Sequence, residues 1–224
     1  MRLLFDGPED TRWTLALAHG AGAPMDSPYM ATVARGLARG GIRVARFEFP
    51  YMEARRDTGR RGAPDREPAL RERWHEVISE LSGAERLAIG GKSLGGRIAS
   101  LVADEAGASA LVCLGYPFHP PGRPDRLRTK HLAALRTPAL IVQGTRDPFG
   151  SPEEVREYKL STSISLVWIE DGDHSFKPRV QGGRPCGPPA PQARSDRTEA
   201  RNLDEAIGAV AAFLRNLDGD PARR

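Results

Sequence analysis

The stretch "LAIGGKSLGGRIAS", residues 87–100, has two interpretations that lead to different proteins. Residues 91–93, Gly-Lys-Ser, match the end of a phosphate-binding loop. Residues 91–95, Gly-Lys-Ser-Leu-Gly, match G-x-S-x-G, the strand-to-helix turn that presents a serine nucleophile. The first interpretation predicts a nucleotide binder and the second a hydrolase, and each requires different neighbouring residues.

The phosphate-binding interpretation lacks its glycines. The pattern G-x-x-x-x-G-K-[ST] needs a glycine at position 86, where Arg86 stands inside a strand-like run. The dinucleotide-binding pattern G-x-G-x-x-G fails here too, and it fails again over residues 20–25, where Met25 takes the last position. A magnesium-dependent nucleotide hydrolase is therefore kept only as a minor alternative.

The nucleophile turn has the residues that it requires. A serine in this strained turn needs small residues two positions before and after it, and Gly91 and Gly95 fill these positions. Gly96 adds room for close packing of the helix on the sheet. An apolar strand precedes Ser93 and an amphipathic helix follows it. We therefore predict Ser93 as the nucleophile, in preference to a serine that only caps its helix.

A serine nucleophile needs a base, and the base needs a carboxylate that orients it. Asp147 and His174 each follow a strand-like run, in the order that this turn predicts. Because the carboxyl ends of parallel strands meet at one edge of a sheet, we predict a triad of Ser93, Asp147 and His174. Asp171 and Asp173 stand too close to His174 in sequence to orient its ring easily.

Backbone N–H groups are expected to complete the site as an oxyanion hole. One donor is the N–H of Leu94, directly after the nucleophile. The other comes from "HGAGAP", residues 19–24, which follow an apolar strand. We predict Ala21 as this second donor, with Gly22 as the alternate, and a structural hydrogen-bonding role for His19.

The other polar candidates have simpler explanations. Lys92 is interpreted as a solvated side chain, in preference to one that attracts acidic substrates. His75 is expected at a helix surface, His131 in solvent and His119 at the rim of the pocket. Asp147 alone would be an ordinary turn residue, so the triad depends on the joint order of its members.

Short apolar, β-branched runs alternate with helical patterns along the chain. Strands are expected at residues 14–20, 42–50, 86–91, 110–117, 138–144 and 164–172, with a weaker edge strand near 2–5. Helices are expected at residues 28–41, 67–83, 93–107, 151–160 and 198–217. This alternation predicts an α/β fold with a mainly parallel, twisted sheet of about six to seven strands, flanked by helices and without a large lid domain.

Composition is typical of one globular α/β domain, here residues 1–224, with 39% hydrophobic and 28% charged residues. No apolar run reaches the roughly 20 residues of a membrane helix and no export signal is visible. We therefore expect a cytoplasmic protein without a membrane partner. The arginines at 55–61 and 179–201 lack interleaved aromatics and are interpreted as solvated loops, not nucleic-acid sites. Residues 177–197, rich in Pro, Gly and Arg, are predicted to form a flexible loop.

The two cysteines give no sign of a metal site or a disulfide framework. Cys113 lies in an apolar strand pattern, where a buried free thiol is expected, and Cys186 lies in the Pro/Gly-rich segment. They lack the paired spacing of zinc ligands. No cofactor motif accompanies the proposed triad, so we expect chemistry without a metal or cofactor.

A set of motifs resembles the α/β-hydrolase superfamily: "LAHGAGAPMDSPYM" (17–30), "GGKSLGGRIAS" (90–100), "LGYPFHPPG" (114–122), "QGTRDPFG" (143–150) and "GDHSF" (172–176). They resemble most the small branch that includes the testis-expressed hydrolase-like proteins, which is distantly similar to dienelactone hydrolases. The resemblance covers about residues 13–176 and the final helix, and it implies a hydrolase whose triad is Ser93, Asp147 and His174. Ser93 stands where dienelactone hydrolases have cysteine, which favours ester chemistry.

The expected function is hydrolysis of a small ester or thioester through an acyl-enzyme. The substrate is expected to be a small acyl compound because only the segment 116–133 offers room for a lid. The alternative is a hydrolase-like module that binds a partner protein and turns over nothing, since some relatives in the branch are regarded as complex subunits.

Overall fold

The computed structural model describes residues 1–60, 62–179 and 197–219 and contains one seven-stranded sheet. The strand order is β1-β3-β2-β4-β5-β6-β7, and β1 is antiparallel to β3 while the other pairs are parallel. The strands are β1 (Leu3–Asp6), β2 (Trp13–Ala18), β3 (Arg43–Phe47), β4 (Arg86–Lys92), β5 (Ala110–Leu114), β6 (Ala139–Gly144) and β7 (Ile164–Ile169). The predicted mainly parallel sheet, its edge strand included, is confirmed.

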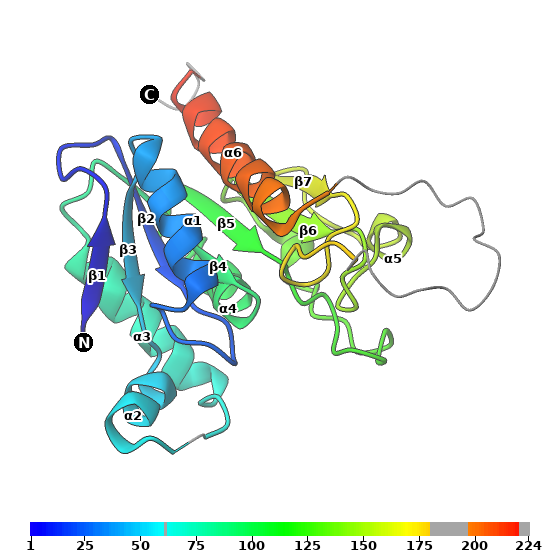
Figure 1. The fold of residues 1–224 in the computed structure, drawn as a ribbon, viewed down its shortest axis with the longest axis horizontal. Coiled ribbons are helices and arrows are strands. Elements are labelled where there is room, and N and C mark those ends of the chain that lie inside the picture. Colours follow the sequence, from blue (N-terminus) through cyan, green and yellow to red (C-terminus); the bar gives the residue numbers. More distant parts are fainter. Residues whose placement is uncertain (61, 180–196, 220–224) are drawn as a thin grey trace.

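Helices cover both faces of this sheet (Figure 1). They are α1 (Pro28–Arg39), α2 (Pro50–Thr58), α3 (Glu67–Glu80), α4 (Leu94–Val102), α5 (Pro152–Arg156) and α6 (Glu199–Asp218), with a 3-10 turn, η1 (Leu132–Ala134). Helices α1 and α6 pack on one face, and α3 and α4 pack on the other. The strands are therefore apolar on both sides, as the continuous runs in the sequence indicate.

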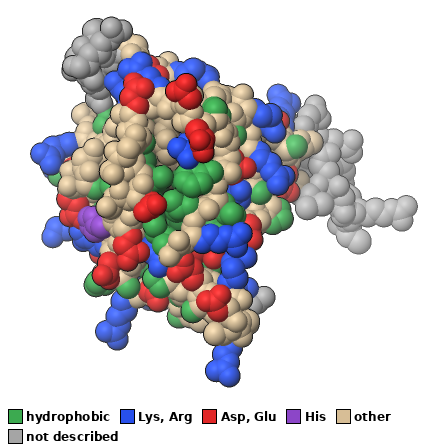
Figure 2. All heavy atoms as spheres, turned by 90° about the vertical axis from the view of Figure 1, so that its left-hand side faces the viewer, with side chains coloured by type: hydrophobic (Ala, Val, Ile, Leu, Met, Phe, Trp, Pro, Cys, Tyr) green, Lys and Arg blue, Asp and Glu red, His purple; other side chains and the backbone are tan. Residues whose placement is uncertain are grey.

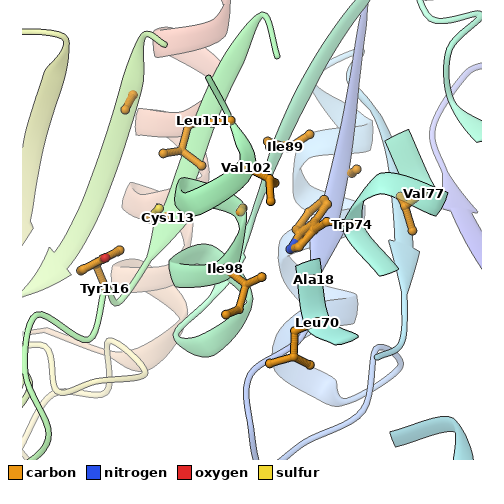
Figure 3. Packing of buried hydrophobic residues seen from close by; sticks show 14 of the residues in the cluster. Ala18, Leu70, Trp74, Val77, Ile89, Ile98, Val102, Leu111, Cys113 and Tyr116 are labelled. Atoms are coloured by element: carbon orange, nitrogen blue, oxygen red, sulfur yellow. The ribbon is translucent and has the colours of Figure 1, made fainter. Parts of the chain in front are cut away.

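The core on the α3 and α4 side is centred on Trp74 (Figure 3). Its indole is fully buried and meets the ring of Phe47 edge-on, with centroids 4.7 Å apart. Ile98 and Val102 of α4 and Ile89 of β4 pack into the same cluster. Full burial of each such aliphatic side chain stabilises the fold by about 1.5–3 kcal/mol, so this layer fixes α4 firmly on the strand that precedes it.

Helix α2 was not predicted from the sequence. It begins at Pro50, shortly after β3, and ends at Thr58, followed by the C-cap Gly59, which is left-handed with φ of 69°. Its arginines remain partly exposed, but Arg55 donates to Gly22 O and Arg56 pairs with both Asp26 and Glu48. The interpretation of this arginine cluster as a loop is therefore wrong for Arg55 and Arg56, which lie in a helix and make defined contacts.

The connections between the last strands contain little regular structure. The segment between β5 and β6 contains only the turn η1, and helix α5 is shorter than predicted. Of the predicted flexible loop 177–197, residues 180–196 lie outside the described residues, as does Cys186. Arg179 is held, since its N–H donates to Asp171 Oδ2 at 3.0 Å.

Figure 2 looks onto the β1 side of the molecule, where hydrophobic side chains gather between charged ones. Met1 and Phe5 are about half exposed there, at 52% and 47%. An open hollow of about 840 Å³ adjoins them and extends to Thr14 and Glu85, at the amino-terminal ends of β2 and β4. It lies at the opposite end of the strands from Ser93. No helix in the described residues has the length and apolar character needed to cross a membrane.

Candidate active site

Ser93 occupies a strained turn between β4 and α4. Its backbone has φ of 52° and ψ of −113°, a conformation that non-glycine residues rarely adopt. A Cβ at Gly91 would lie 2.5 Å from Ala18 O, and one at Gly95 would lie 2.6 Å from the same oxygen. Only glycine fits at either position, which is why the pattern needs both.

Two simpler explanations of this stretch are excluded by the local geometry. The Ser93 side chain makes no capping hydrogen bond to α4. Residues 86–92 form β4, so no glycine loop precedes Ser93 to surround a phosphate. Ser93 therefore stands at the N-cap position of α4 with a strained backbone but without a capping hydrogen bond from its side chain.

The structure brings together the three residues of the predicted triad. His174 Nε2 lies 2.9 Å from Ser93 Oγ, and His174 Nδ1 lies 2.7 Å from Asp147 Oδ2. The Asp147 side chain is fully buried, while the His174 side chain is 22% exposed. Asp171 pairs with Arg146 and does not contact the imidazole. The three groups form one continuous hydrogen-bonded series from a buried carboxylate to an accessible hydroxyl.

Gln143, which sequence reasoning missed, holds the Asp147 carboxylate. Its Nε2 donates to Asp147 Oδ2 at 2.9 Å, while Asp147 Oδ1 accepts the N–H of Phe149 at 2.9 Å. The amide also bonds the backbone of Tyr116, accepting from its N–H and donating to its oxygen. The only signal in the sequence is a glutamine at the end of an otherwise apolar strand.

The His174 ring has a close-fitting seat. The ring of Phe149 lies against it, with centroids 4.2 Å apart. On another side, a Cβ at Gly115 would come within 2.8 Å of His174 O and 3.2 Å of Nδ1. Gly115 also has a positive φ of 65°, so two separate constraints require glycine there.

The predicted oxyanion donors have no acceptor of their own. Among the described residues, the N–H groups of Ala21, Gly22 and Leu94 donate to no protein oxygen. The loop passes close to the nucleophile, since a Cβ at Gly20 would lie 3.7 Å from Ser93 Cβ. These donors are therefore available to a ligand oxygen.

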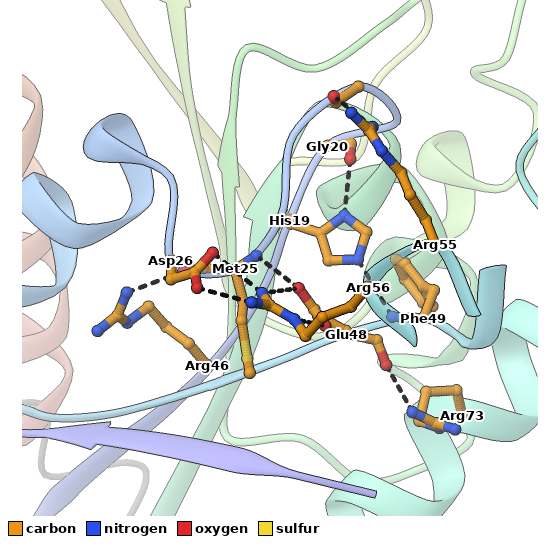
Figure 4. A network of polar contacts seen from close by, with 11 residues as sticks. His19, Gly20, Met25, Asp26, Arg46, Glu48, Phe49, Arg55, Arg56 and Arg73 are labelled. Atoms are coloured by element: carbon orange, nitrogen blue, oxygen red, sulfur yellow. Dashed lines mark hydrogen bonds and ion pairs between the residues drawn. The ribbon is translucent and has the colours of Figure 1, made fainter. Parts of the chain in front are cut away.

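His19 has the structural role predicted for it (Figure 4). It is fully buried, its Nδ1 lies 2.7 Å from Gly20 O, and its Nε2 accepts the N–H of Phe49 at 3.1 Å. Burial lowers its pKa, so the ring is neutral and carries its proton on Nδ1.

An ion-pair network fixes the far end of the same loop (Figure 4). Arg56 bonds Asp26 at 2.9 Å and Glu48 at 2.6 Å. Glu48 Oε1 accepts the N–H of Met25 at 3.3 Å, and Arg46 donates to Met25 O at 2.8 Å. Side chains from β3 and α2 thus hold the loop that follows β2 by its backbone and by Asp26.

Lys92 is not the solvated side chain that was expected. It is only 8% exposed, its Nζ donates to the backbone oxygen of His174, and it lies 5.6 Å from the centre of the Tyr29 ring. Burial lowers the pKa of Lys92 to about 8, although Asp147 and Asp173 favour the charged form. Lys92 therefore links the nucleophile turn to the loop that carries the histidine.

Two further histidines differ from expectation and one agrees with it. His131 is not exposed, because it is half-buried and its Nε2 lies 2.8 Å from Ser100 Oγ. His119 does not reach the pocket rim, since it is 3% exposed and its Nε2 lies 3.5 Å from Glu154 Oε2. His75 is on a helix surface as predicted, with a half-exposed side chain.

A pocket of about 320 Å³ opens over Ser93. It is lined by Gly20, Ala21, Gly22, Ala23, Ser27, Tyr29, Met30, Lys92, Ser93, Phe149, His174 and Ser175. None of these residues comes from 116–133, so that segment does not form a wall of the pocket. In the part of the chain that the structure describes, no three His, Cys, Asp or Glu side chains gather as potential metal ligands.

A protein-family model described as an alpha/beta hydrolase domain matches residues 11–186. The chain belongs to this family. The fold is also similar to that of a dienelactone hydrolase from Anabaena variabilis, at 21% identity, a TM-score of 0.71 and coverage of 96% of this chain and 90% of that one. An alpha-beta serine hydrolase homologue from Coxiella burnetii gives 19% identity, a TM-score of 0.67 and coverage of 96% and 90%.

A serine hydrolase without a lid from Xanthomonas campestris is similar as well, at 19% identity, a TM-score of 0.65 and coverage of 96% and 88%. At these identities the likeness is one of fold. The α/β-hydrolase fold predicted from the motifs is thus confirmed, and the chain has a fold that supports hydrolysis.

Proposed function

We propose that this α/β-hydrolase is a serine hydrolase that cleaves a small ester or thioester through an acyl-enzyme. The observation that carries the proposal is the hydrogen-bonded series from Asp147 through His174 to Ser93, with distances of 2.7 and 2.9 Å. The pocket above Ser93 supplies a place for the acyl group, and free N–H groups border it. The motifs also lead us to place the chain in the branch of testis-expressed hydrolase-like proteins.

Acylation uses the three side chains in fixed roles. Ser93 Oγ attacks the carbonyl carbon while His174 Nε2 takes its proton, and Asp147 stabilises the imidazolium that forms. The carbonyl oxygen becomes an oxyanion that accepts hydrogen bonds from the N–H groups of Ala21 and Leu94. The bond to the leaving group then breaks, and His174 passes its proton to the departing alcohol or thiol.

Deacylation repeats the sequence with water. His174 takes a proton from the water as its oxygen attacks the acyl carbon, and the oxyanion forms in the same place. When the bond to Ser93 breaks, His174 returns the proton to Ser93 Oγ. The products are a carboxylic acid and the alcohol or thiol released earlier, so no cofactor takes part in the balance.

A fluorophosphonate probe tests the chemistry directly because it forms a covalent bond only with an activated serine. We expect stoichiometric labelling of the wild type and none of Ser93→Ala. Ser161→Ala is the matched control, since that serine bonds Leu135 O and stands outside the pocket. A wild type that does not react would instead favour the alternative of a binding module without turnover.

A series of p-nitrophenyl esters of increasing acyl length then measures the size of the substrate. The pocket of about 320 Å³ predicts a preference for short acyl groups. Ser93→Ala and His174→Ala should each lower kcat by roughly 10⁴-fold or more. Activity that survives in Ser93→Ala would show that another residue is the nucleophile.

A further inference from the structure

Helix α2 presents a tyrosine hydroxyl to the backbone of the proposed oxyanion loop. Tyr51 Oη lies 3.2 Å from Ala21 O and 3.3 Å from Gly20 O, so its proton is shared between the two carbonyls. The Gly20 carbonyl also has His19 Nδ1 as a partner, at 2.7 Å. Among the described residues, Ala21 O has Tyr51 as its only hydrogen-bond donor.

The direction of a held carbonyl fixes the direction of the next N–H. A trans peptide is planar, and its C=O and N–H groups point in opposite directions. The described chain has no cis peptide bonds. Because Tyr51 holds Gly20 O and Ala21 O, the N–H groups of Ala21 and Gly22 point away from the tyrosine.

The lining of the pocket indicates that it lies on the side of the loop away from Tyr51. Residues 20–23 line the pocket together with Ser93 and His174, whereas Tyr51 does not line it. The N–H groups of Ala21 and Gly22 therefore face the space above the nucleophile, and both lack an acceptor in the described chain.

The Ala21–Gly22 peptide depends most on this restraint, because His19 also holds Gly20 O whereas Tyr51 is the only donor to Ala21 O among the described residues. A Cβ at Gly22 would meet nothing within 4 Å, so packing alone does not prevent this peptide from rotating. Tyr51 is itself well fixed. Its ring is 7% exposed and stacks with Phe49 at 6.4 Å, and its N–H donates to Asp65 Oδ2 at 2.8 Å.

We propose that Tyr51 is a positioning residue, which holds the Gly20–Ala21 and Ala21–Gly22 peptides so that their N–H groups face the oxyanion. This proposal rests on the hydrolase function proposed above. The hydroxyl acts through the loop and does not touch the substrate. It stays protonated over any practical assay range, because burial raises the pKa of Tyr51.

Tyr51→Phe tests the proposal, since it removes the hydroxyl and keeps the ring. Oxyanion donors bind the transition state more strongly than the substrate. We therefore expect kcat for p-nitrophenyl acetate, expressed per site titrated with fluorophosphonate, to fall about tenfold or more while KM stays within about twofold. The affinity for a trifluoromethyl ketone, which forms a tetrahedral oxyanion on the serine, should weaken by a similar factor.

Tyr158→Phe is the matched control, because its ring packs on Phe118, away from the pocket, and we expect no change in kcat per titrated site. A purely structural role for Tyr51 would lower the melting temperature and the number of titrated sites but leave kcat per site unchanged, and that result would overturn the proposal. Ser93→Ala keeps the two proposals separate. If Ser93→Ala is inactive while Tyr51→Phe retains full kcat, the hydrolase stands and the positioning role fails.

Discussion

Gln143 is fully buried in β6, among apolar neighbours, and its amide bonds both Asp147 and the backbone of Tyr116. A carboxylate that must orient an imidazole needs a fixed direction of its own. The Gln143 amide and the N–H of Phe149 supply it, one to each oxygen of Asp147. Asp147, the proposed partner of His174, is thus itself oriented by an uncharged donor on the preceding strand.

Gln143→Leu should therefore weaken both the reaction and the fold. The substitution removes a donor to Asp147 and leaves the buried N–H of Tyr116 without its acceptor, which costs about 1–3 kcal/mol, whereas Tyr116 O keeps the N–H of Phe118. We expect kcat per titrated site to fall by roughly 10–100-fold, with a clear loss in the free energy of unfolding measured in urea. A variant with the wild-type kcat per site would show that Asp147 needs no such support.

Lys92 makes the stability of the fold depend on pH. Its pKa falls from 10.5 in the unfolded chain to about 8 in the folded one, because burial disfavours the ammonium. Between these values the unfolded state binds more protons than the folded state, so stability rises with pH. The stability gained when Lys92 is neutral is fully present above the pKa of Lys92 in the unfolded chain. It is lost as the pH falls through the pKa of Lys92 in the folded protein.

Comparison with Lys92→Met isolates this effect, since other titrating groups contribute equally to both proteins. From pH 7.5 to pH 9.5, the free energy of unfolding of the wild type should rise relative to the variant by about 2 kcal/mol. Urea unfolding at three pH values across this range measures the difference. A difference that does not change with pH would mean that Lys92 stays protonated throughout.

Single residues also show where sequence reasoning reaches its limit. Ser93, Asp147 and His174 were predicted because each follows its own strand, and the carboxyl ends of parallel strands share one edge. The burial of Lys92 depends on the loop at His174, which is distant in sequence. The local sequence around Lys92 therefore gave no sign of that burial, and Lys92 was interpreted as solvated. Gln143 was missed for the same reason, since its partner Tyr116 belongs to another strand connection.

Among the elements, the turn from β4 into α4 depends most on close approach. Gly95 lies in the first turn of α4, against the end of β2, where a Cβ would lie 2.6 Å from Ala18 O and 2.7 Å from His19 O. Those atoms are backbone in a buried strand end and cannot yield as a flexible side chain would. The same contact places Ser93 beside the loop that carries Ala21.

Gly95→Ala should therefore separate α4 from β2 and disturb both the nucleophile and the oxyanion loop. We expect a loss of at least about 2 kcal/mol in the free energy of unfolding, together with reduced fluorophosphonate labelling. Gly208→Ala is the matched control, because Gly208 lies inside α6 with nothing within 4 Å of an added Cβ. There the change should stabilise the protein by about 0.5–1 kcal/mol. Equal effects at the two glycines would contradict the close-approach argument.

Helix α2 shows why one element escaped prediction while the strands did not. Its nine residues bury only Tyr51 and Met52, so it has almost no apolar periodicity. Its stability comes from partners far along the chain, such as the pairing of Arg56 with Asp26 and Glu48. The strands were predicted from their apolar runs, because burial on both faces of the sheet favours apolar residues at nearly every position. An element held by long-range ion pairs gives no such local signal.

At the scale of the whole molecule, the site is assembled from loops at the carboxyl ends of β2, β4, β6 and β7 (Figure 1). The last helix joins this assembly from the far end of the sequence. Asn202 of α6 is fully buried, and its Nδ2 donates to Phe176 O at 2.8 Å and to Glu170 O at 3.4 Å. The residues that carry these two carbonyls flank His174 in the sequence, and Phe176 has a positive φ of 67°. Helix α6 therefore holds both ends of the loop that carries His174.

Asn202→Ala should loosen that loop without touching the reacting groups. The change leaves Phe176 O buried without its donor, so we expect a loss of about 1–3 kcal/mol in the free energy of unfolding. Because His174 then samples positions away from Ser93, kcat per titrated site should fall several-fold as well. Urea unfolding and active-site titration measure the two effects separately.

Asn216→Ala on the same helix is the matched control, because this residue is exposed and its side chain bonds no described residue. Its effect on the free energy of unfolding should stay within about 0.5 kcal/mol, since the substitution touches no buried feature. If both asparagine variants keep the wild-type kcat per site, α6 supports the sheet but not the position of His174. If kcat per site falls only in Asn202→Ala, the final helix helps to hold His174 in position beside Ser93, although α6 is distant from both residues in the sequence.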